Sequence, residues 1–254
     1  MSETCLAAQL YTVREFTQTE ADFAESMRKV RKIGYRAVQL SAVGPIPPER
    51  VRAILDEEGL TACATHVSYD TMRDDPAAVI EEHRILGCSY PAIGGLPKAY
   101  RTEDGYHRFA RECSDVAAKL AEAGLTFGYH NHRFEFERFD GVTGFEILYN
   151  ESDPQVFKGE PDTYWIQAGG ADPAYWIGWL RDRAPLIHLK DMAIRDNQQV
   201  FAEVGEGNLN WPAIFEACKA AGAVWYIVEQ DTCPGDPFDS LAISHRNLRE
   251  MGFR

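Results

Sequence analysis

The sequence lacks any apolar run long enough to cross a membrane. No stretch approaches the roughly 18 consecutive apolar residues that a transmembrane helix needs. The first residues also lack a basic segment followed by an apolar one, so we expect no secretory signal peptide. The sequence therefore predicts a cytoplasmic protein that does not act at a membrane.

Cysteine is sparse and scattered. The 254 residues include six cysteines, and no two of them form a CxxC pair. Neither a disulfide framework nor a thiolate zinc site is therefore indicated. Because most of them fall in predicted strands or helices, we expect reduced thiols that pack as small apolar residues. They are Cys5, Cys63, Cys88, Cys113, Cys218 and Cys233.

Positive charge is also in short supply. Lysine and arginine total 26 against 39 acidic residues, which gives a formal net charge of −13. A surface of this sign repels phosphate backbones, so we expect no nucleic-acid partner. A GxGxxG fingerprint is missing as well, since the segment around Gly205 and Gly207 has neither its spacing nor its strand-to-helix context.

What the sequence does contain is a regular alternation of short apolar runs with helical stretches. Eight such runs, each followed by a helix-sized segment, predict parallel strands joined by right-handed crossovers. Polar residues end strands throughout the chain, which favours a closed barrel over an open, doubly wound sheet. We therefore expect an α/β fold, one (β/α)8 TIM barrel forming a single domain over residues 1–254. The predicted strands are Leu6–Val13, Ala37–Ser41, Thr61–Ser68, Tyr90–Gly94, Thr126–His132, Val156–Asp162, Pro185–Lys190 and Trp225–Asp231.

Glycine follows several of the helical stretches directly. This is a helix C-cap signal, because glycine adopts left-handed φ without a Cβ penalty. Long loops are predicted after strands five and seven, at Arg133–Thr143 and Met192–Asn210, where barrel loops often build or cover a site. The helices predicted in this way are Asp22–Ile33, Pro48–Glu58, Asp104–Ala123, Trp211–Ala221 and Phe238–Met251.

Four consecutive predicted strands finish in residue types that bind metals. All strands of a parallel barrel end on one face, so one side chain from each strand could bind a single ion. The predicted ligands are His130, Asp162, His188 and Glu229, with Glu160 as a rival for the fourth position. Imidazole plus carboxylate suits a divalent ion, with Mn as first choice and Zn, Fe, Co or Mg as alternatives. The competing interpretation is that these groups are only hydrogen-bonded polar residues at strand ends.

Three further side chains near these strand ends could act on a substrate. His132 could orient the substrate or transfer a proton, or else hold a ligand in place. Glu135 could bind substrate or be a solvated loop carboxylate. Lys190 shares a strand face with His188 and could bind a phosphate or a substrate oxygen, or act in catalysis by lowering the pKa of a hydroxyl group; an ion pair with Asp191 or Glu206 is the alternative.

Other candidates lie around the predicted barrel mouth. His66 ends strand three and would enter the pocket from the opposite wall. Gln9 and Arg14 flank the end of strand one, where they could bind substrate hydroxyls or lie at the surface. Trp165 could stack on the apolar face of a sugar ring, whereas Trp176 and Trp179 are more typical of helix packing; for these last two we expect packing alone.

Taken together, these motifs resemble the sugar phosphate isomerase/epimerase family, the xylose isomerase-like TIM barrels. The resemblance covers nearly the whole chain and is specific in order and spacing, although it does not indicate a substrate. It rests on Ala8-Gln-Leu-Tyr-Thr-Val-Arg14, Gly34-Tyr-Arg-Ala-Val-Gln-Leu-Ser41, Gly128-Tyr-His-Asn-His132 with Phe134-Glu-Phe136, Asp162-Thr-Tyr-Trp165, Ala168-Gly169 with Asp172-Pro173, His188-Leu-Lys-Asp191, Glu203-Val-Gly-Glu-Gly207 and Glu229-Gln-Asp231.

The resemblance implies one divalent ion, commonly Mn, bound by a Glu, an Asp, a His and a Glu from strands five to eight. Asp162, His188 and Glu229 match three of these positions, and His130 stands where the family has the strand-five Glu. In the epimerases the two glutamates exchange the substrate proton. In this chain Glu229 would be one base, and His132 or Glu160 would have to supply the other.

The leading functional hypothesis is a metal-dependent isomerase or epimerase acting on a sugar or keto-sugar. It would abstract a proton next to the carbonyl through a metal-stabilised enediolate. One alternative is an inosose dehydratase-like or 3-keto-glycoside lyase, which shares that step and then expels a leaving group. Another is a sugar-binding barrel without catalysis. An abasic-site endonuclease is disfavoured by the charge of −13, and self-association into a homo-oligomer stays open.

Overall fold

The eight predicted apolar runs form the strands of one parallel sheet. The computed structural model describes residues 5–253, and every pairing within this sheet is parallel. The strands are β1 (Cys5–Gln9), β2 (Ala37–Leu40), β3 (Thr61–His66), β4 (Pro91–Ile93), β5 (Gly128–His130), β8 (Lys158–Glu160), β9 (Leu186–Leu189) and β12 (Trp225–Val228).

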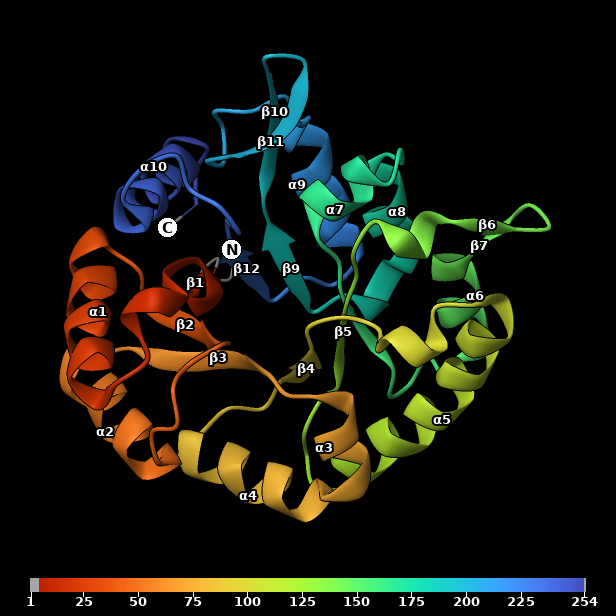
Figure 1. The fold of residues 1–254 in the computed structure, drawn as a ribbon, viewed down its shortest axis with the longest axis horizontal. Helices are drawn as coiled ribbons and strands as arrows, with labels where there is room; N and C mark the ends of the chain where they lie inside the picture. The colour runs from red at the N-terminus through yellow and green to blue at the C-terminus, as the bar shows by residue number, and fades with distance from the viewer. Residues whose placement is uncertain (1–4, 254) are drawn as a thin grey trace.

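This sheet curls into a barrel (Figure 1). Its strand order is β8-β5-β4-β3-β2-β1-β12-β9, so β8 and β9 are the two edges that must meet for closure. They meet just beyond β8, where Asp162 and His188 form an isolated parallel bridge and the His188 N–H donates to the Pro161 carbonyl at 3.0 Å. The predicted TIM barrel is therefore confirmed.

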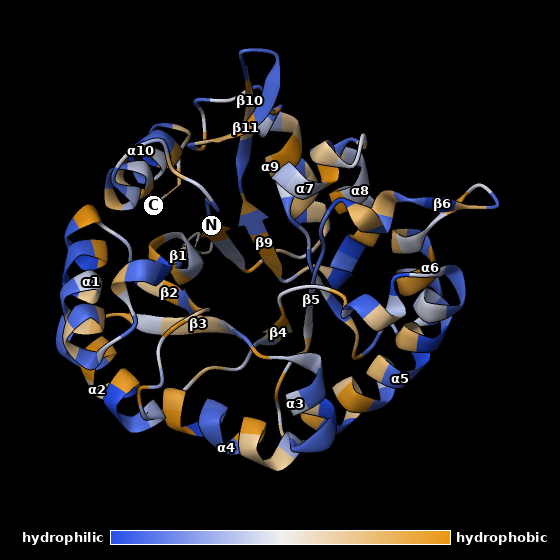
Figure 2. Cartoon of the chain, viewed as in Figure 1, coloured by the Kyte–Doolittle hydropathy of each residue, from blue (hydrophilic) through white to orange (hydrophobic). Residues whose placement is uncertain are grey.

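Helices surround the barrel, and Figure 2 shows hydrophilic and hydrophobic positions alternating along them, as packing of one face on the strands requires. The predicted helix Pro48–Glu58 is confirmed with both ends unchanged, and Gly59 after it has φ 65°. The other four predicted helices are confirmed with ends shifted by one or two residues.

Within residues 5–253, none of the helices has both the length and the hydropathy to cross a membrane. They are α1 (Glu20–Ile33), α2 (Pro48–Glu58), α3 (Tyr69–Asp74), α4 (Pro76–Leu86), α5 (Glu103–Glu122), α6 (Gly144–Glu151), α7 (Thr163–Ala168), α8 (Pro173–Leu180), α9 (Trp211–Ala220) and α10 (Pro237–Glu250).

The first strand is shorter than the sequence predicts. The run Leu6–Val13 is extended only as far as Gln9, and Leu10–Phe16 form a 3-10 helix instead. The Gln9 side chain accepts a hydrogen bond from the Tyr11 backbone N–H at 3.2 Å and so caps this helix. An apolar run by itself does not distinguish a buried strand from a buried helical turn, which is why the prediction was wrong here.

The two predicted long loops contain β-hairpins. Residues 140–141 and 196–197 all have positive φ, the geometry of the tight two-residue turns that join antiparallel strands. Both hairpins project from the barrel in Figure 1. Their strands are β6 (Arg138–Phe139) with β7 (Val142–Thr143), and β10 (Asp191–Arg195) with β11 (Gln198–Ala202).

The interior of the barrel is layered, and the layering positions the polar residues. A compact apolar cluster of mostly small side chains, including Ala7, Ala37 and Leu186, fills one level. Residues two apart on a strand share a face, so Gln39 and His188 occupy the next level toward the strand ends. Both are fully buried. A polar layer therefore lies on an apolar floor inside the barrel.

The cysteine prediction holds for the side chains that the structure describes. Cys63, Cys88, Cys113 and Cys218 are free and buried, and Cys233 is free and partly buried. The side chain of Cys5 lies outside the described set. Burial raises the pKa of the Cys113 thiol, as expected for a thiol that packs as an apolar group.

Candidate metal centre

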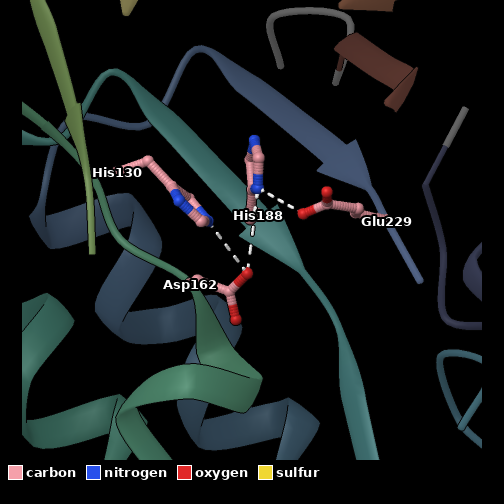
Figure 3. A group of neighbouring side chains, drawn as sticks. All are labelled: His130, Asp162, His188 and Glu229. Carbon is pink, nitrogen blue, oxygen red and sulfur yellow. Dashed lines mark hydrogen bonds and ion pairs between the residues drawn. The ribbon is translucent and has the colours of Figure 1, made fainter. Parts of the chain in front are cut away.

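Four side chains from the last four barrel strands converge at the carboxyl end of the barrel (Figure 3). His130 ends β5 and His188 lies in β9, while Asp162 and Glu229 follow β8 and β12. One potential ligand atom from each residue lies within 4.8 Å of all the others, and all four residues are buried. The structure thus brings together the four residues predicted as ligands, in a cluster of the kind that holds a divalent cation.

The hydrogen bonds around Gln39 determine how His188 faces this cluster. The Glu160 carboxylate can only accept, so the Gln39 amide nitrogen faces it, at 2.7 Å. The Gln39 carbonyl oxygen consequently accepts from Gln9 at 2.8 Å and from Nε2 of His188 at 2.7 Å. His188 therefore carries a proton on Nε2 and turns Nδ1 toward the cluster, with Glu229 2.9 Å away.

His130 is oriented by a similar restraint. Its Nδ1 lies 3.2 Å from the Gly94 carbonyl oxygen, which can only accept, so Nδ1 carries a proton. Nε2 is the ring nitrogen that faces the cluster, 3.2 Å from an Asp162 carboxylate oxygen. Two imidazoles and two carboxylates that converge in this way form a donor set that fits a divalent metal.

Asp162 is fixed from two sides. Its Oδ1 accepts from the Trp165 backbone N–H at 2.9 Å and so caps α7. Its backbone N–H donates to Asn131 Oδ1 at 3.1 Å. This arrangement leaves Oδ2 as the oxygen that faces His130 and His188.

The charges in the cluster shift several pKa values. Burial alone would raise the pKa of Asp162, but Lys190 and His130 outweigh it and hold that pKa well below its usual range. Burial would lower the pKa of His188, yet the flanking carboxylates of Glu160 and Glu229 raise it. Without a metal, His188 is therefore held as an imidazolium, and metal binding at Nδ1 would release one proton.

Glu160 lies behind this cluster rather than within it. Its two oxygens are engaged by Gln39 at 2.7 Å and by Nε2 of His66 at 2.7 Å, and the side chain is fully buried. His66 in turn contacts the Ser41 hydroxyl at 3.2 Å through Nδ1. Burial would raise the Glu160 pKa, but His188 and His66 outweigh it and lower the pKa, so the group stays an anion that orients its neighbours.

Lys190 is the side chain for which the sequence suggested the wrong ion-pair partners. Its ammonium is fully buried and lies 3.0 Å from Asp162, 2.8 Å from Glu229 and 2.9 Å from Asp231. Neither alternative partner, Asp191 or Glu206, pairs with it within the described residues. Burial would lower the Lys190 pKa, but the three carboxylates raise it, so the group is charged.

Asp191 is instead the support of the loop that follows β11. Its carboxylate accepts from the backbone N–H groups of Gly205, Gly207 and Leu209 at 2.9 to 3.2 Å and from Trp211 Nε1 at 2.7 Å. An added Cβ on Gly207 would come within 2.2 Å of the Asp191 side chain. Within the His-x-Lys-Asp run, His188 therefore belongs to the cluster, Lys190 balances its charge and Asp191 supports the adjoining loop.

His132 lies beside the cluster in the loop after β5. Its ring centroid is 5.0 Å from that of His130 and 5.1 Å from that of Trp165. Burial, followed by the charge of His130, lowers its pKa to about 3, so the ring is neutral. Its Nδ1 and the indole Nε1 of Trp165 are buried polar atoms without a partner within the described residues.

Glu135 is neither solvated nor free. It is fully buried, and its two oxygens accept from the Tyr129 hydroxyl at 2.7 Å and from the His132 backbone N–H at 2.9 Å. Burial raises its pKa to about 7. The expectation of a solvated loop carboxylate is wrong, and a substrate contact would have to replace one of these two bonds. Glu135 positions the loop that carries His132.

The remaining candidates divide between the barrel interior and its rim. Gln9 is fully buried against Gln39, so the surface alternative is wrong for it. Arg14 is partly buried and donates to the carbonyl oxygens of Tyr11 and Asp231. Trp176 is buried against aromatic neighbours and packs as predicted.

Sequence reasoning assigned no role to three residues that organise this site: Gln39, Asn131 and Asp231. Each lies inside a motif that was recognised, and each has a polar side chain at or just beyond the end of a strand. The strand-end signal that identified His188 applies equally to Gln39. An amide is not a typical metal ligand, however, so its orienting role was visible only from its hydrogen bonds.

A parallel barrel with two imidazoles and two carboxylates buried at its strand ends is the architecture of a metal-dependent barrel enzyme. Residues 27–251 match the xylose isomerase-like TIM barrel family model, and the chain belongs to this family. The family comprises metal-dependent enzymes that convert sugars, among them isomerases, epimerases and dehydratases.

Individual relatives are distant. The chain is 27% identical over 165 residues to inosose dehydratase of Geobacillus thermodenitrificans (strain NG80-2), which is 58% of this chain and 52% of that protein. It is 25% identical over 179 residues to rhizopine catabolism protein MocC of Rhizobium meliloti, 59% of this chain and 52% of that protein. The matched part thus spans about half the length of these relatives.

Among solved structures, a sugar phosphate isomerase/epimerase from Parabacteroides distasonis is similar to this chain with a TM-score of 0.83. The sequence identity is 22%, and the superposition covers 100% of this chain and 96% of the other. At this identity the similarity establishes the fold.

Proposed function

We propose that this protein is a divalent-metal-dependent sugar isomerase or epimerase that removes a proton next to the carbonyl group of a keto-sugar. The observation that carries this proposal is the convergence of His130, Asp162, His188 and Glu229 within 4.8 Å of one another. Both imidazoles are constrained by neighbouring hydrogen bonds to direct a ring nitrogen into the cluster. We propose these four as the ligands, with Glu160 as the group that orients His188.

A divalent cation bound there would polarise the substrate carbonyl and offset the negative charge that develops on its oxygen. Glu229 is the carboxylate of the cluster nearest both His188 and Lys190, at 2.9 and 2.8 Å. We assign it the removal of the proton. Its basicity is restrained by these two cationic neighbours, which lower its pKa.

His132 supplies the second acid–base group of the proposed mechanism. Its ring is neutral and its Nδ1 has no partner within the described residues, so it can accept a proton from the substrate. Its ring and those of Phe134 and Trp165 form an aromatic wall beside the cluster, suited to the C–H face of a sugar. Gln9 and His66 act on the substrate indirectly, through Gln39 and Glu160.

Dehydration of a keto-polyol is the second candidate. His130 stands where the family's epimerases have a second glutamate, which removes one of the two carboxylates that exchange the proton. The similarity to inosose dehydratase supports the same alternative. In this version Glu229 removes the proton and, once protonated, returns it to the departing hydroxyl group, which leaves as water.

Hydrogen exchange distinguishes these outcomes. The protein, loaded with Mn, is incubated in deuterated water with ketoses and with a keto-inositol, and the carbon next to the carbonyl is followed by NMR. We expect deuterium to enter at that carbon, with a new isomer for the leading proposal and an unsaturated, ultraviolet-absorbing product for dehydration.

The variant Glu229→Gln should slow this exchange by roughly 100-fold or more, the usual contribution of a positioned acid–base group. The exposed Glu216→Gln is the matched control and should exchange at the wild-type rate. Full activity of metal-free protein, or unchanged exchange in Glu229→Gln, would overturn the proposal.

A further inference from the structure

Lys190 occupies an unusual position for a lysine. It is fully buried, and three carboxylates surround its ammonium at 2.8 to 3.0 Å. A buried ammonium is stable only when paired, and here the pairing is complete. Each contact therefore uses a carboxylate oxygen that could otherwise serve another cation.

Two of the three oxygens are the ones the metal cluster needs. Lys190 contacts Oδ2 of Asp162, which also faces His130 and His188. It contacts Oε2 of Glu229, which also faces His188. The ammonium and a metal held by this cluster would therefore share both of its carboxylates, and two cations on shared oxygens repel each other.

The third carboxylate lies outside the cluster. Asp231 is 2.9 Å from the ammonium, and its side chain is 23% exposed, whereas those of Asp162 and Glu229 are 0% and 5% exposed. It lines a cleft of about 500 Å³ together with Thr12 and Arg14. The rings of Trp165 and Phe201 lie 5.5 and 5.7 Å from the ammonium and add favourable cation–π contacts. Lys190 thus has a partner that a bound metal does not take.

We propose that Lys190 is a built-in competitor of the metal, which occupies Asp162 and Glu229 in the metal-free protein and keeps only Asp231 once the metal is bound. This inference rests on the proposed function, because it assumes that the cluster takes a divalent cation. It assigns Lys190 two effects: it stabilises the empty site against carboxylate repulsion, and it weakens metal binding. It assigns Asp231 the opposite effect, since holding Lys190 aside favours the metal.

The affinity of metal-free protein for Mn, measured by titration calorimetry, tests this directly. We expect Lys190→Met, which keeps most of the stem and removes the charge, to bind Mn at least about tenfold more tightly than wild type. Lys190→Arg keeps the charge and should remain weak. The matched control is Lys219→Met, which removes an exposed, ion-paired lysine and should leave the affinity unchanged. Equal or weaker binding by a folded Lys190→Met would overturn the inference.

Asp231→Asn supplies an independent test that keeps the lysine. We expect weaker Mn binding in the wild-type background and a clearly smaller loss in the Lys190→Met background, because Asp231 acts through Lys190. The same loss in both backgrounds would show that Asp231 acts only through its own charge, and the inference would fail. If Lys190→Met does not fold without metal, Lys190→Gln replaces it both in the affinity comparison and as the background for Asp231→Asn.

The two proposals fail in different ways. Wild-type protein that binds no divalent metal at all would overturn the proposed function and this inference with it. Wild-type protein that binds about one Mn per chain, with Lys190→Met no tighter, would overturn the inference alone.

Discussion

The first four strands of the barrel and the last four contribute different chemistry to one site. β1, β2 and β4 present neutral groups to it, namely Gln9, Gln39 and the Gly94 carbonyl, and β3 adds His66, whose pKa burial lowers. The last four strands present the carboxylates and the two imidazoles of the cluster. The last four strands therefore supply the groups that could bind a cation. The first four strands determine which ring nitrogen of each imidazole faces the cluster.

The largest effect on metal binding should come from substituting a charged residue of the last four strands. We expect Asp162→Ala to lose metal binding by more than the roughly 100-fold typical of changes to residues that only orient a ligand, because it removes a proposed ligand itself. Metal content per chain and Mn affinity are the measurements. The exposed Asp104→Ala serves as control, and retained metal in Asp162→Ala would contradict the ligand assignment.

Breaking the neutral half should have a smaller but definite effect. Gln39→Leu removes the amide that fixes His188 and Glu160, while all four proposed ligands are kept. We expect a loss of about 10- to 100-fold in Mn affinity with the fold retained by circular dichroism. The exposed Gln198→Leu is the control. An unchanged affinity would mean that this half of the barrel contributes packing alone.

Glu135 is a buried carboxyl group in the second half of the barrel, and it tests whether every such group acts on the metal cluster. Its pKa is raised to about 7 in the folded protein from 4.5, so the folded state holds a proton that the unfolded state has lost between these pH values. Its contribution to stability therefore falls as pH rises from 4.5 to about 7 and is level above that.

Glu135→Gln removes this titration. The free energy of unfolding of the variant, minus that of the wild type, should rise over the same pH window by up to about 3 kcal/mol. Loss of a hydrogen-bond acceptor should lower this difference by a similar amount at every pH. Urea denaturation of metal-free protein at several pH values measures it, with the exposed Glu137→Gln as reference. A difference that does not change with pH would refute this assignment.

The smallest expected effect concerns Gln9, which reaches the cluster only through Gln39. Gln9→Leu removes the 2.8 Å hydrogen bond to Gln39, worth about 1 kcal/mol or roughly fivefold in Mn affinity if all of it orients the site. In the Gln39→Leu background the same change should have no further effect on affinity. An additive loss would mean that Gln9 acts on the site by another route.

The order of elements was predictable from the sequence because each strand is a short apolar run and Pro48–Glu58 carries both a start and a stop signal. The misjudged parts are those where a side chain changes the backbone locally. Gln9 caps a 3-10 helix inside an apolar run, and residues 140–141 and 196–197 turn hairpins inside apparent loops. The Asp-Gly pair at 140–141 is a hairpin signal that the sequence offered.

The candidate ligands could be predicted because strand ends meet on one face. Their orientation could not, since it depends on hydrogen bonds between residues far apart in the chain, such as Gln39 with Glu160 and His188. Lys190 shows the same limit. Its neighbours in sequence suggested Asp191 as partner, whereas the barrel places it among Asp162, Glu229 and Asp231.

The bridge between Asp162 and His188 has a mechanical consequence. It is the point where the two edges of the sheet meet, so the seam of the barrel, where hydrogen bonding between strands closes the circle, lies at the candidate metal centre. A cation bound by both side chains would link the two edges of the sheet from inside the barrel. Metal binding should therefore oppose local separation of β8 from β9. The backbone amide protons on either side of the seam should exchange more slowly in the metal-loaded protein than in the metal-free protein.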